Sequence, residues 1–229
     1  MTREVDPRRR RGPSPTQGGP HRNLSPGGSG SDAVSFDFPT LVPYLLTLSE
    51  LVPVLQFKNA WLRNAARAPL ERLPALEGKP IIVQRIRDLR DRRGPVHAGS
   101  FIRRREIAFD CTRSEFPRIF VHELFHFAWV RAGNKLRLSY ENELKDELRR
   151  AFPGELGWSA EWRKLALKRN DIRTRNMRWR EYSCESFCDT GAWLYSGLSR
   201  HAEFTLSPAG RRARRAWFHS QIGGRPLPI

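Results

Sequence analysis

The feature that most constrains this chain of 229 residues is a strongly apolar segment near its middle that also carries titratable side chains. Between residues 114 and 134 the apolar residues are so dense that a helix formed there would be buried on most sides. His122, Glu123 and His126 interrupt this segment. Because an unpaired imidazole or carboxylate is costly inside a protein, these residues predict a bound partner. A metal ion is a partner that two imidazoles can share.

The ends of this helix are also marked in the sequence. Ser114 can cap its N-terminus, and Glu115 and Pro117 suit its first turn. Gly133 and Asn134 can end it. The signals on both sides therefore predict one complete helix around the three polar residues.

The spacing of the two histidines suits a shared metal ion. His122 and His126 are four residues apart, which is about 400° of rotation along a helix, so both imidazoles project from the same side. Glu123 lies beside them, where a carboxylate can take a proton from a metal-bound water. The segment therefore predicts a zinc site with His122 and His126 as ligands and Glu123 as the general base.

A catalytic zinc site needs a third protein ligand as well as an open position for water. The remaining histidines are weak candidates, because they lie in the N-terminal segment or outside any strong helical pattern: His21, His97, His201 and His219. Glu185 is the better candidate, since it lies beside the apolar face of the last strong predicted helix, Arg180 to Leu198. We therefore expect Glu185 to be the third zinc ligand.

Asp189 follows Glu185 by about one helical turn, so the two carboxylates form a short acidic stripe. Asp189 is expected to accept the N–H of a ligand histidine and so fix its tautomer. In an alternative interpretation, Glu181 and Glu185 form a solvated helix edge. On the same helix, Cys184 and Cys188 are also four residues apart. We interpret both as small buried core residues, and a thiolate ligand is the alternative.

The pattern His-Glu-x-x-His at 122 to 126, followed by Glu-x-x-x-Asp at 185 to 189, resembles the gluzincins, the thermolysin-like branch of zinc peptidases. This resemblance implies a zincin-like α+β fold that is mostly helical, with a small mixed sheet preceding the active-site helix. It also implies that the edge strand of the sheet pairs with an extended substrate, as β-strand addition would explain. Arg105 to Cys111 is the candidate for that edge strand.

Other elements follow from the spacing of apolar residues. A short strand is expected at Lys79 to Val83, and the alternation of Ile107, Phe109 and Cys111 predicts that the strand at Arg105 to Cys111 is half-buried. The remaining predicted elements are helices: Phe38 to Arg67, Leu138 to Phe152, Trp158 to Lys168 and Arg180 to Leu198.

The N-terminal region differs in composition from the rest of the chain. Residues 1–33 contain the run Arg8 to Arg11, many Pro, Gly and Ser residues and almost no large apolar side chains. Such a segment predicts a disordered basic tail, which leaves residues 34–229 as one zincin-like metallohydrolase domain. No segment reaches the ~18 to 20 uninterrupted apolar residues of a membrane span.

The charge and the cysteine count bear on partners and location. The formal net charge is +17, which attracts nucleic acid, anionic lipid or acidic proteins. Because the arginines are scattered rather than interleaved with aromatic residues, we expect nucleic-acid binding to be weak if it occurs. Three cysteines are too few for a disulfide framework, and they favour a reducing, cytoplasmic setting.

The expected function is zinc-dependent hydrolysis of a bond in a peptide or protein substrate. An oxyanion stabiliser is needed as well, and Tyr182, Tyr195 and His201 are candidates. Two alternatives are open: a regulatory or DNA-associated zincin protease that cleaves a specific protein partner, and a non-catalytic zinc-binding interaction domain. Glu123 argues against the second alternative, because a structural metal site has no use for a base.

Overall fold

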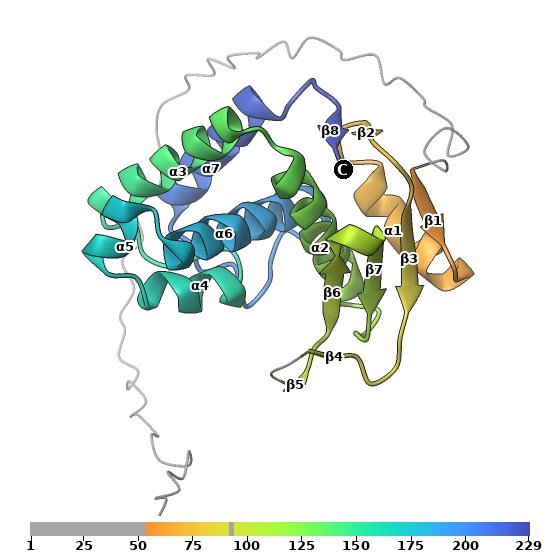
Figure 1. Cartoon of the computed structure of the whole chain (residues 1–229). Coiled ribbons are helices and arrows are strands. Elements are labelled where there is room, and N and C mark those ends of the chain that lie inside the picture. The colour runs from red at the N-terminus through yellow and green to blue at the C-terminus, as the bar shows by residue number, and fades with distance from the viewer. Residues whose placement is uncertain (1–53, 92–93) are drawn as a thin grey trace, which may run out of the picture. The chain divides into compact units, whose positions relative to one another are not determined.

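The structure is a computed structural model that describes residues 54–91 and 94–229, all within the unit Tyr44–Ile229. The expected tail, residues 1–33, lies outside the described residues, as do residues 38–53 of the helix expected at Phe38 to Arg67. The described part is an α+β fold, in which a small mixed sheet lies beside a larger group of helices (Figure 1). The expected class, with the sheet preceding the histidine helix, is confirmed at this coarse level.

The main sheet contains four strands among the described residues, in the order β1 (Leu55–Phe57), β3 (Ile81–Arg85), β7 (Glu106–Phe109) and β6 (Ala98–Phe101). The first three strands of this order run parallel, and β6 runs antiparallel to β7. A 3-10 turn, Ile102–Arg104, joins β6 to β7. Two smaller pairs are β2 (Leu76–Glu77) with β8 (Leu227–Pro228), and β4 (Arg90–Asp91) with β5 (Gly94–Pro95).

Helices α1 (Ala60–Leu70) and α2 (Phe116–Arg131) pack against the main sheet. Aromatic rings make much of this contact. The ring of Phe109 on β7 lies 4.9 Å from that of Phe116 and 6.4 Å from that of Phe120, both on α2. All three are fully buried, so α2 is fixed against the sheet along its first half.

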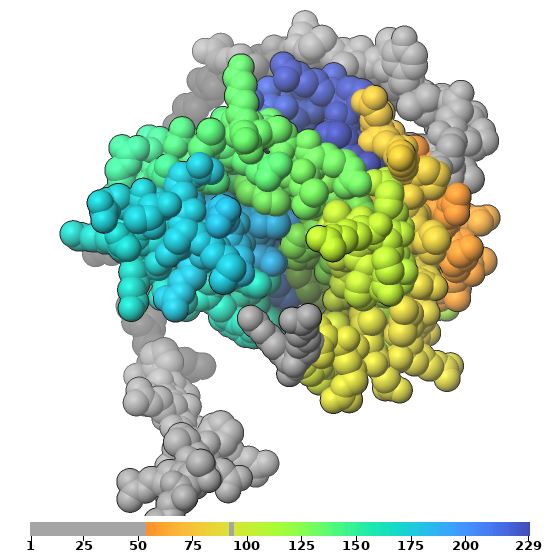
Figure 2. Space-filling model, viewed as in Figure 1, coloured from red at the N-terminus to blue at the C-terminus, as the bar shows by residue number. Residues whose placement is uncertain are grey.

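The other side of α2 packs against the helical part of the fold (Figure 1). That part consists of α3 (Asn134–Arg149), α4 (Trp158–Leu165), α5 (Arg169–Thr174), α6 (Met177–Tyr195) and α7 (Pro208–Gln221). Helix α6 approaches α2 closely at Gly191, where a Cβ atom would lie 2.5 Å from Cδ1 of Phe125. Glycine therefore sets the distance between the two helices. Figure 2 shows this helical part and the strands on one face, with a hollow between them.

A buried ionic network ties α7 to the other helices. Arg214 on α7 is fully buried and makes hydrogen bonds to Glu147 of α3 at 2.8 Å, and to Oε1 of Glu155 at 3.0 Å. The other oxygen, Oε2 of Glu155, lies 2.8 Å from Nη1 of Arg214 without hydrogen-bond geometry, so this contact is electrostatic. Tyr182 of α6 donates to Oε1 of Glu155 at 2.6 Å. The network compensates the burial of three charges.

The helix expected at Phe38 to Arg67 is confirmed for residues 60–67, which belong to α1, and is wrong for the described residues before Ala60. Residues 55–57 form β1, because they pair with residues 81–83 of the neighbouring strand. Helix α1 begins only after Asn59, whose side chain accepts a hydrogen bond from the backbone N of Trp61 at 3.0 Å. Pairing with a neighbouring strand therefore outweighed the helical spacing of apolar residues before Asn59, and the helix begins only at the Asn59 cap.

The start of α2 also differs from expectation. Ser114 does not cap the helix, because its hydroxyl lies 3.0 Å from that of Thr112. Glu115 takes the N-cap position without a capping hydrogen bond, and its carboxylate pairs with Arg118 instead.

Two differences concern the later helices. The helix expected at Trp158 to Lys168 ends at Leu165, and α5 follows as a separate helix. Helix α7 was missed, although Ser207 marks its start by accepting a hydrogen bond from the backbone N of Gly210 at 3.2 Å. Pro208 suits its first turn.

Among the described residues, no helix is both long enough and apolar enough to cross a membrane.

Candidate metal centre

The two motif histidines lie on one side of α2, as their spacing predicts. Nε2 of His122 and Nε2 of His126 are 3.2 Å apart. A tetrahedral zinc ion, with bonds of ~2.0 to 2.1 Å to nitrogen, separates neighbouring ligand atoms by roughly 3.3 Å. The two imidazoles are therefore spaced as ligands of one ion would be.

Glu185 meets these histidines from α6. Its Oε2 atom lies 3.5 Å from Nε2 of His122, and its side chain is 16% exposed. Its other oxygen, Oε1, lies 3.4 Å from Nη2 of Arg163 on α4. The alternative interpretation of Glu185 as a solvated helix edge is therefore wrong, whereas Glu181 is exposed. The role of Glu185 as a ligand stays a prediction.

Asp189 lies next to the other ring nitrogen of His122. Its Oδ1 atom is 2.8 Å from Nδ1 of His122, and its Oδ2 atom accepts hydrogen bonds from the Ser159 hydroxyl at 3.1 Å and the Ala160 backbone N at 3.3 Å. Gly157 makes room for this carboxylate, since a Cβ atom there would lie 2.2 Å from Cγ of Asp189. The start of α4 therefore holds Asp189 in place.

Glu123 is buried and has one strong hydrogen-bond partner. The hydroxyl of Ser100 on β6 lies 2.6 Å from Oε2 of Glu123 and 2.7 Å from its backbone oxygen. Sequence reasoning missed Ser100, because β6 is short and its sequence carries no apolar alternation. The contact fixes the Glu123 side chain on the strand side of α2.

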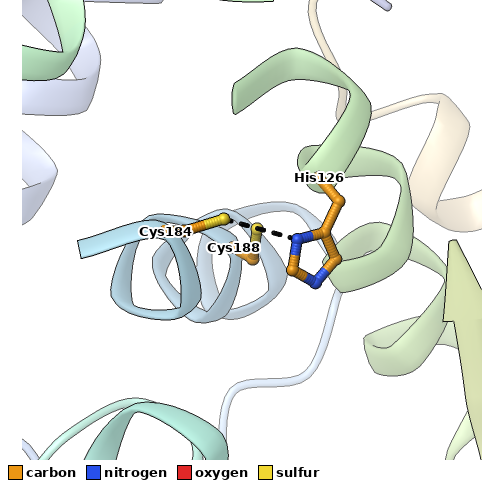
Figure 3. A group of neighbouring side chains, drawn as sticks. All are labelled: His126, Cys184 and Cys188. Atoms are coloured by element: carbon orange, nitrogen blue, oxygen red, sulfur yellow. Dashed lines mark hydrogen bonds between the residues drawn. The ribbon is translucent and has the colours of Figure 1, made fainter. Parts of the chain in front are cut away.

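The cysteines of α6 lie at the other nitrogen of His126 (Figure 3). Sγ of Cys184 is 3.5 Å from Nδ1 of His126, and Cys188 lies one turn further along the same helix. The preferred interpretation as core residues holds for Cys188, which is fully buried. Cys184 is only partly buried, and its contact with His126 was not expected.

Carboxylates dominate the electrostatics of the centre. Burial by itself would lower the pKa of His122, but the charge of Asp189 and hydrogen bonds to Asp189 and Glu185 raise it well above its ordinary value. Burial would likewise raise the pKa of Glu185, and its hydrogen bond with His122 and the nearby positive charges instead bring it well below its ordinary value. The centre therefore stabilises positive charge between the imidazoles and Glu185.

A cavity of about 210 Å³ adjoins the centre. It is lined by His122, Glu123 and Asp189, together with His97, Ala98 of β6 and Ser159 of α4. Glu123, the predicted base, and His122, a predicted ligand, are therefore accessible from the space between β6 and the start of α4. His97 was set aside in the sequence because it lies outside any helix, yet it lines this cavity.

None of the three expected oxyanion stabilisers lines this cavity. Tyr182 is wrong as a candidate, because it is fully buried and its hydroxyl donates to Glu155. Tyr195 stacks on Phe125 with ring centroids 5.7 Å apart. Nε2 of His201 lies 3.3 Å from Oε1 of Glu115, in a cluster with Glu203, and only Glu203 of these three residues lines the cavity.

The expected substrate-binding edge is also wrong. Strand β7, within Arg105 to Cys111, lies inside the sheet between β3 and β6, and residues 107–109 are all fully buried rather than half-buried. The edge nearest the centre is β6, which pairs only with β7 among the described strands. An alternating sequence could not reveal this, because position within a sheet depends on strands elsewhere in the chain.

The donor set suits a zinc ion. Two imidazole nitrogens and a carboxylate oxygen are ligand types found in catalytic zinc sites. The Nδ1 atoms of His122 and His126 contact Asp189 and Cys184, and the two Nε2 atoms face each other at 3.2 Å. The buried carboxylates also supply the negative charge that a divalent cation needs.

Comparisons of the chain with family models, curated proteins and solved structures give no significant match. Function is therefore inferred from the residues of the site.

Proposed function

We propose that this protein is a zinc-dependent peptidase with His122, His126 and Glu185 as zinc ligands and Glu123 as the general base. The observation that carries the proposal is the 3.2 Å separation of the two Nε2 atoms, together with the contact of Oε2 of Glu185 with Nε2 of His122 at 3.5 Å. These residues come from two helices that are far apart in sequence, α2 and α6.

Zinc bound by this set would supply a Lewis acid for a substrate carbonyl and would lower the pKa of water. The chain's own residues would orient and transfer the proton. Asp189 contacts Nδ1 of His122, so Nε2 would be the nitrogen of this ring that binds the ion. Glu123 lines the cavity and accepts a hydrogen bond from Ser100 at Oε2. This leaves Oε1 as the atom that takes the proton and returns it to the leaving amine.

Strand β6 supports a peptide as the substrate class. Only one of its edges pairs with another described strand, and Ser100 of β6 contacts the proposed base. An extended peptide hydrogen-bonded to the other edge would thus pass beside Glu123. His97 and Arg118 both line the cavity, and each could stabilise an oxyanion. The free thiols of the three cysteines are compatible with a reducing, cytoplasmic setting.

The decisive experiment compares the parent protein with Glu123→Gln. Both are purified, their zinc content is measured, and both are incubated with a peptide library. The parent should contain about one zinc per chain and cleave peptides. The variant should keep the zinc and the fold and lose cleavage, since the change removes a base and not a ligand. Equal cleavage by both proteins would contradict the role of Glu123. Absence of zinc from the parent would contradict the metal site.

A further inference from the structure

His126 has a second set of metal-binding atoms on the opposite side of its ring from His122. Its Nδ1 atom faces α6, where the thiols of Cys184 and Cys188 project toward it (Figure 3). We propose that His126, Cys184 and Cys188 form a second cation site, which binds a soft monovalent metal ion such as Cu(I).

The positions of the three atoms support this site. Nδ1 of His126 and both Sγ atoms lie within 4.8 Å of one another. The contact between Sγ of Cys184 and Nδ1 of His126 is 3.5 Å. Metal bonds of ~2.3 Å to sulfur and ~2.0 Å to nitrogen separate such a pair of ligand atoms by roughly 3.5 to 3.7 Å, for tetrahedral or trigonal angles. A small movement of Cys188 would complete the set.

The two cysteines have the same four-residue spacing as the two histidines of α2. Cys184 and Cys188 are four residues apart on α6, so both thiols lie on one side of that helix. Two of the chain's three cysteines thus converge on one imidazole. Cys188 is fully buried and Cys184 is partly buried, which leaves a route to the site past Cys184.

The donors define the class of ion. Two sulfur atoms and one imidazole nitrogen form a soft set, which suits Cu(I) and Zn²⁺ better than hard cations. Binding forms two metal–sulfur bonds and one metal–nitrogen bond, and the two thiol protons leave to solvent. The neutral imidazole binds through its Nδ1 lone pair and carries its proton on Nε2.

A proton on Nε2 of His126 would couple the second cation site to the proposed zinc site. This part of the inference rests on the proposed function. A neutral imidazole has one lone pair in its plane, so His126 can serve Cu(I) through Nδ1 or zinc through Nε2, but not both at once. The two ions should therefore weaken each other's binding by the same factor, because coupling between two sites is reciprocal. Binding of Cu(I) at the second cation site would thus inhibit peptide hydrolysis at the zinc site.

The first experiment titrates the full-length, reduced chain with Cu(I) without oxygen, in competition with a chromophoric Cu(I) chelator. The parent should bind one Cu(I) per chain at the second cation site. The Cys184→Ser/Cys188→Ser double variant should lose this binding, and Cys111→Ser should keep it. Equal Cu(I) binding by the parent and the double variant, or no binding by the parent, would overturn the proposal.

Thiol alkylation of the parent protein provides a measurement that does not depend on how the variants fold. Bound Cu(I) should protect Cys184 from a thiol reagent, as read by mass spectrometry of the peptides, and should leave the rate at Cys111 unchanged. Equal alkylation of Cys184 with and without Cu(I) would refute the site.

The coupling is tested separately, with zinc affinity measured in the presence and absence of Cu(I). Glu185→Gln serves as the matched control, because it weakens the zinc site and retains all three soft donors. If Glu185→Gln and the parent both bind Cu(I) but the parent binds no zinc, the proposed function is contradicted. The second cation site is then supported independently of it. If the parent binds both ions with no mutual weakening, the shared use of His126 is wrong.

Discussion

Oδ1 of Asp189 lies 2.8 Å from Nδ1 of His122, and the opposite nitrogen of the same ring faces His126 at 3.2 Å. Asp189 is itself held by Ser159 and Ala160 at the start of α4. The orientation of a predicted zinc ligand is therefore set by a helix that contributes no ligand of its own.

Changing Asp189 to Asn should weaken zinc binding without abolishing it. The amide keeps the shape of the side chain but loses the charge that favours the N–H of His122 at Nδ1, and such losses are typically about 10- to 100-fold in affinity. Zinc titration against a competing chelator measures the effect. Ser159→Ala is the control, because it removes one donor to Asp189 and leaves the His122 contact intact. Unchanged affinity in Asp189→Asn would argue against this role.

Changing Glu185 to Ala should have a larger effect, because a direct bond to zinc is lost. Zinc content after dialysis should fall from about one per chain to near zero. Glu181→Ala is the matched control, since Glu181 is one turn earlier on the same helix and is exposed. If the Glu185 variant retains zinc as the parent does, the third ligand is another residue.

Ser100 is a positioning residue for Glu123, and Ser100→Ala should lower kcat with little change in KM or zinc content. A hydrogen bond to a charged group contributes ~1.5 to 3 kcal/mol, which corresponds to roughly a 10- to 100-fold loss of rate. Ser100→Thr keeps the hydroxyl and should recover most of the rate. A matching loss in both variants would indicate a packing defect rather than the loss of this hydrogen bond.

Arg214→Met should destabilise the fold strongly. It leaves Glu147 and Glu155 buried without their shared partner, and breaking a buried pair in this way costs about 3 to 5 kcal/mol in the free energy of unfolding. Denaturant unfolding monitored by circular dichroism measures it. Arg212→Met, on the exposed side of the same helix, should change stability by less than ~0.5 kcal/mol. Similar stability of both variants would contradict the structural role of Arg214.

The same network predicts a loss of stability in acid. Burial would raise the pKa of Glu155, but the charges of Arg214 and Lys164 and hydrogen bonds from Arg214 and Tyr182 bring it below its ordinary value. Glu147 lies across Arg214 from Glu155. A carboxyl with a lowered pKa in the folded state contributes stability above the unfolded pKa of ~4.3, and this contribution is lost as pH falls below it.

The free energy of unfolding of the parent should therefore decrease below about pH 4.3, by up to ~1.4 kcal/mol per pH unit for this one group. Glu155→Gln should remove that part of the slope, because an amide does not titrate. Chemical unfolding at several pH values between about 3 and 6 measures the difference. Parallel curves for the two proteins would show that Glu155 does not contribute.

The sequence by itself determined the local parts of the candidate centre. Apolar density and the spacing of His122 and His126 predicted a buried helix with two imidazoles on one side, and α2 has this form. The helical spacing of Glu185 and Asp189 predicted neighbouring carboxylates beside a buried face, and both contact His122. These features were predictable because contacts between residues four apart depend on helix geometry alone.

Tertiary structure decided what depends on distant segments. Residues 55–57 became a strand because they pair with residues 81–83, and β7 became an interior strand because β6 covers its outer edge. Ser100 reaches Glu123 from β6, and Cys184 reaches His126 across the contact between α6 and α2, which approach closely at Gly191. The spacing of apolar residues within a segment predicts which face of the helix or strand is buried. The identity of the neighbour across that face is set by packing between elements far apart in the chain.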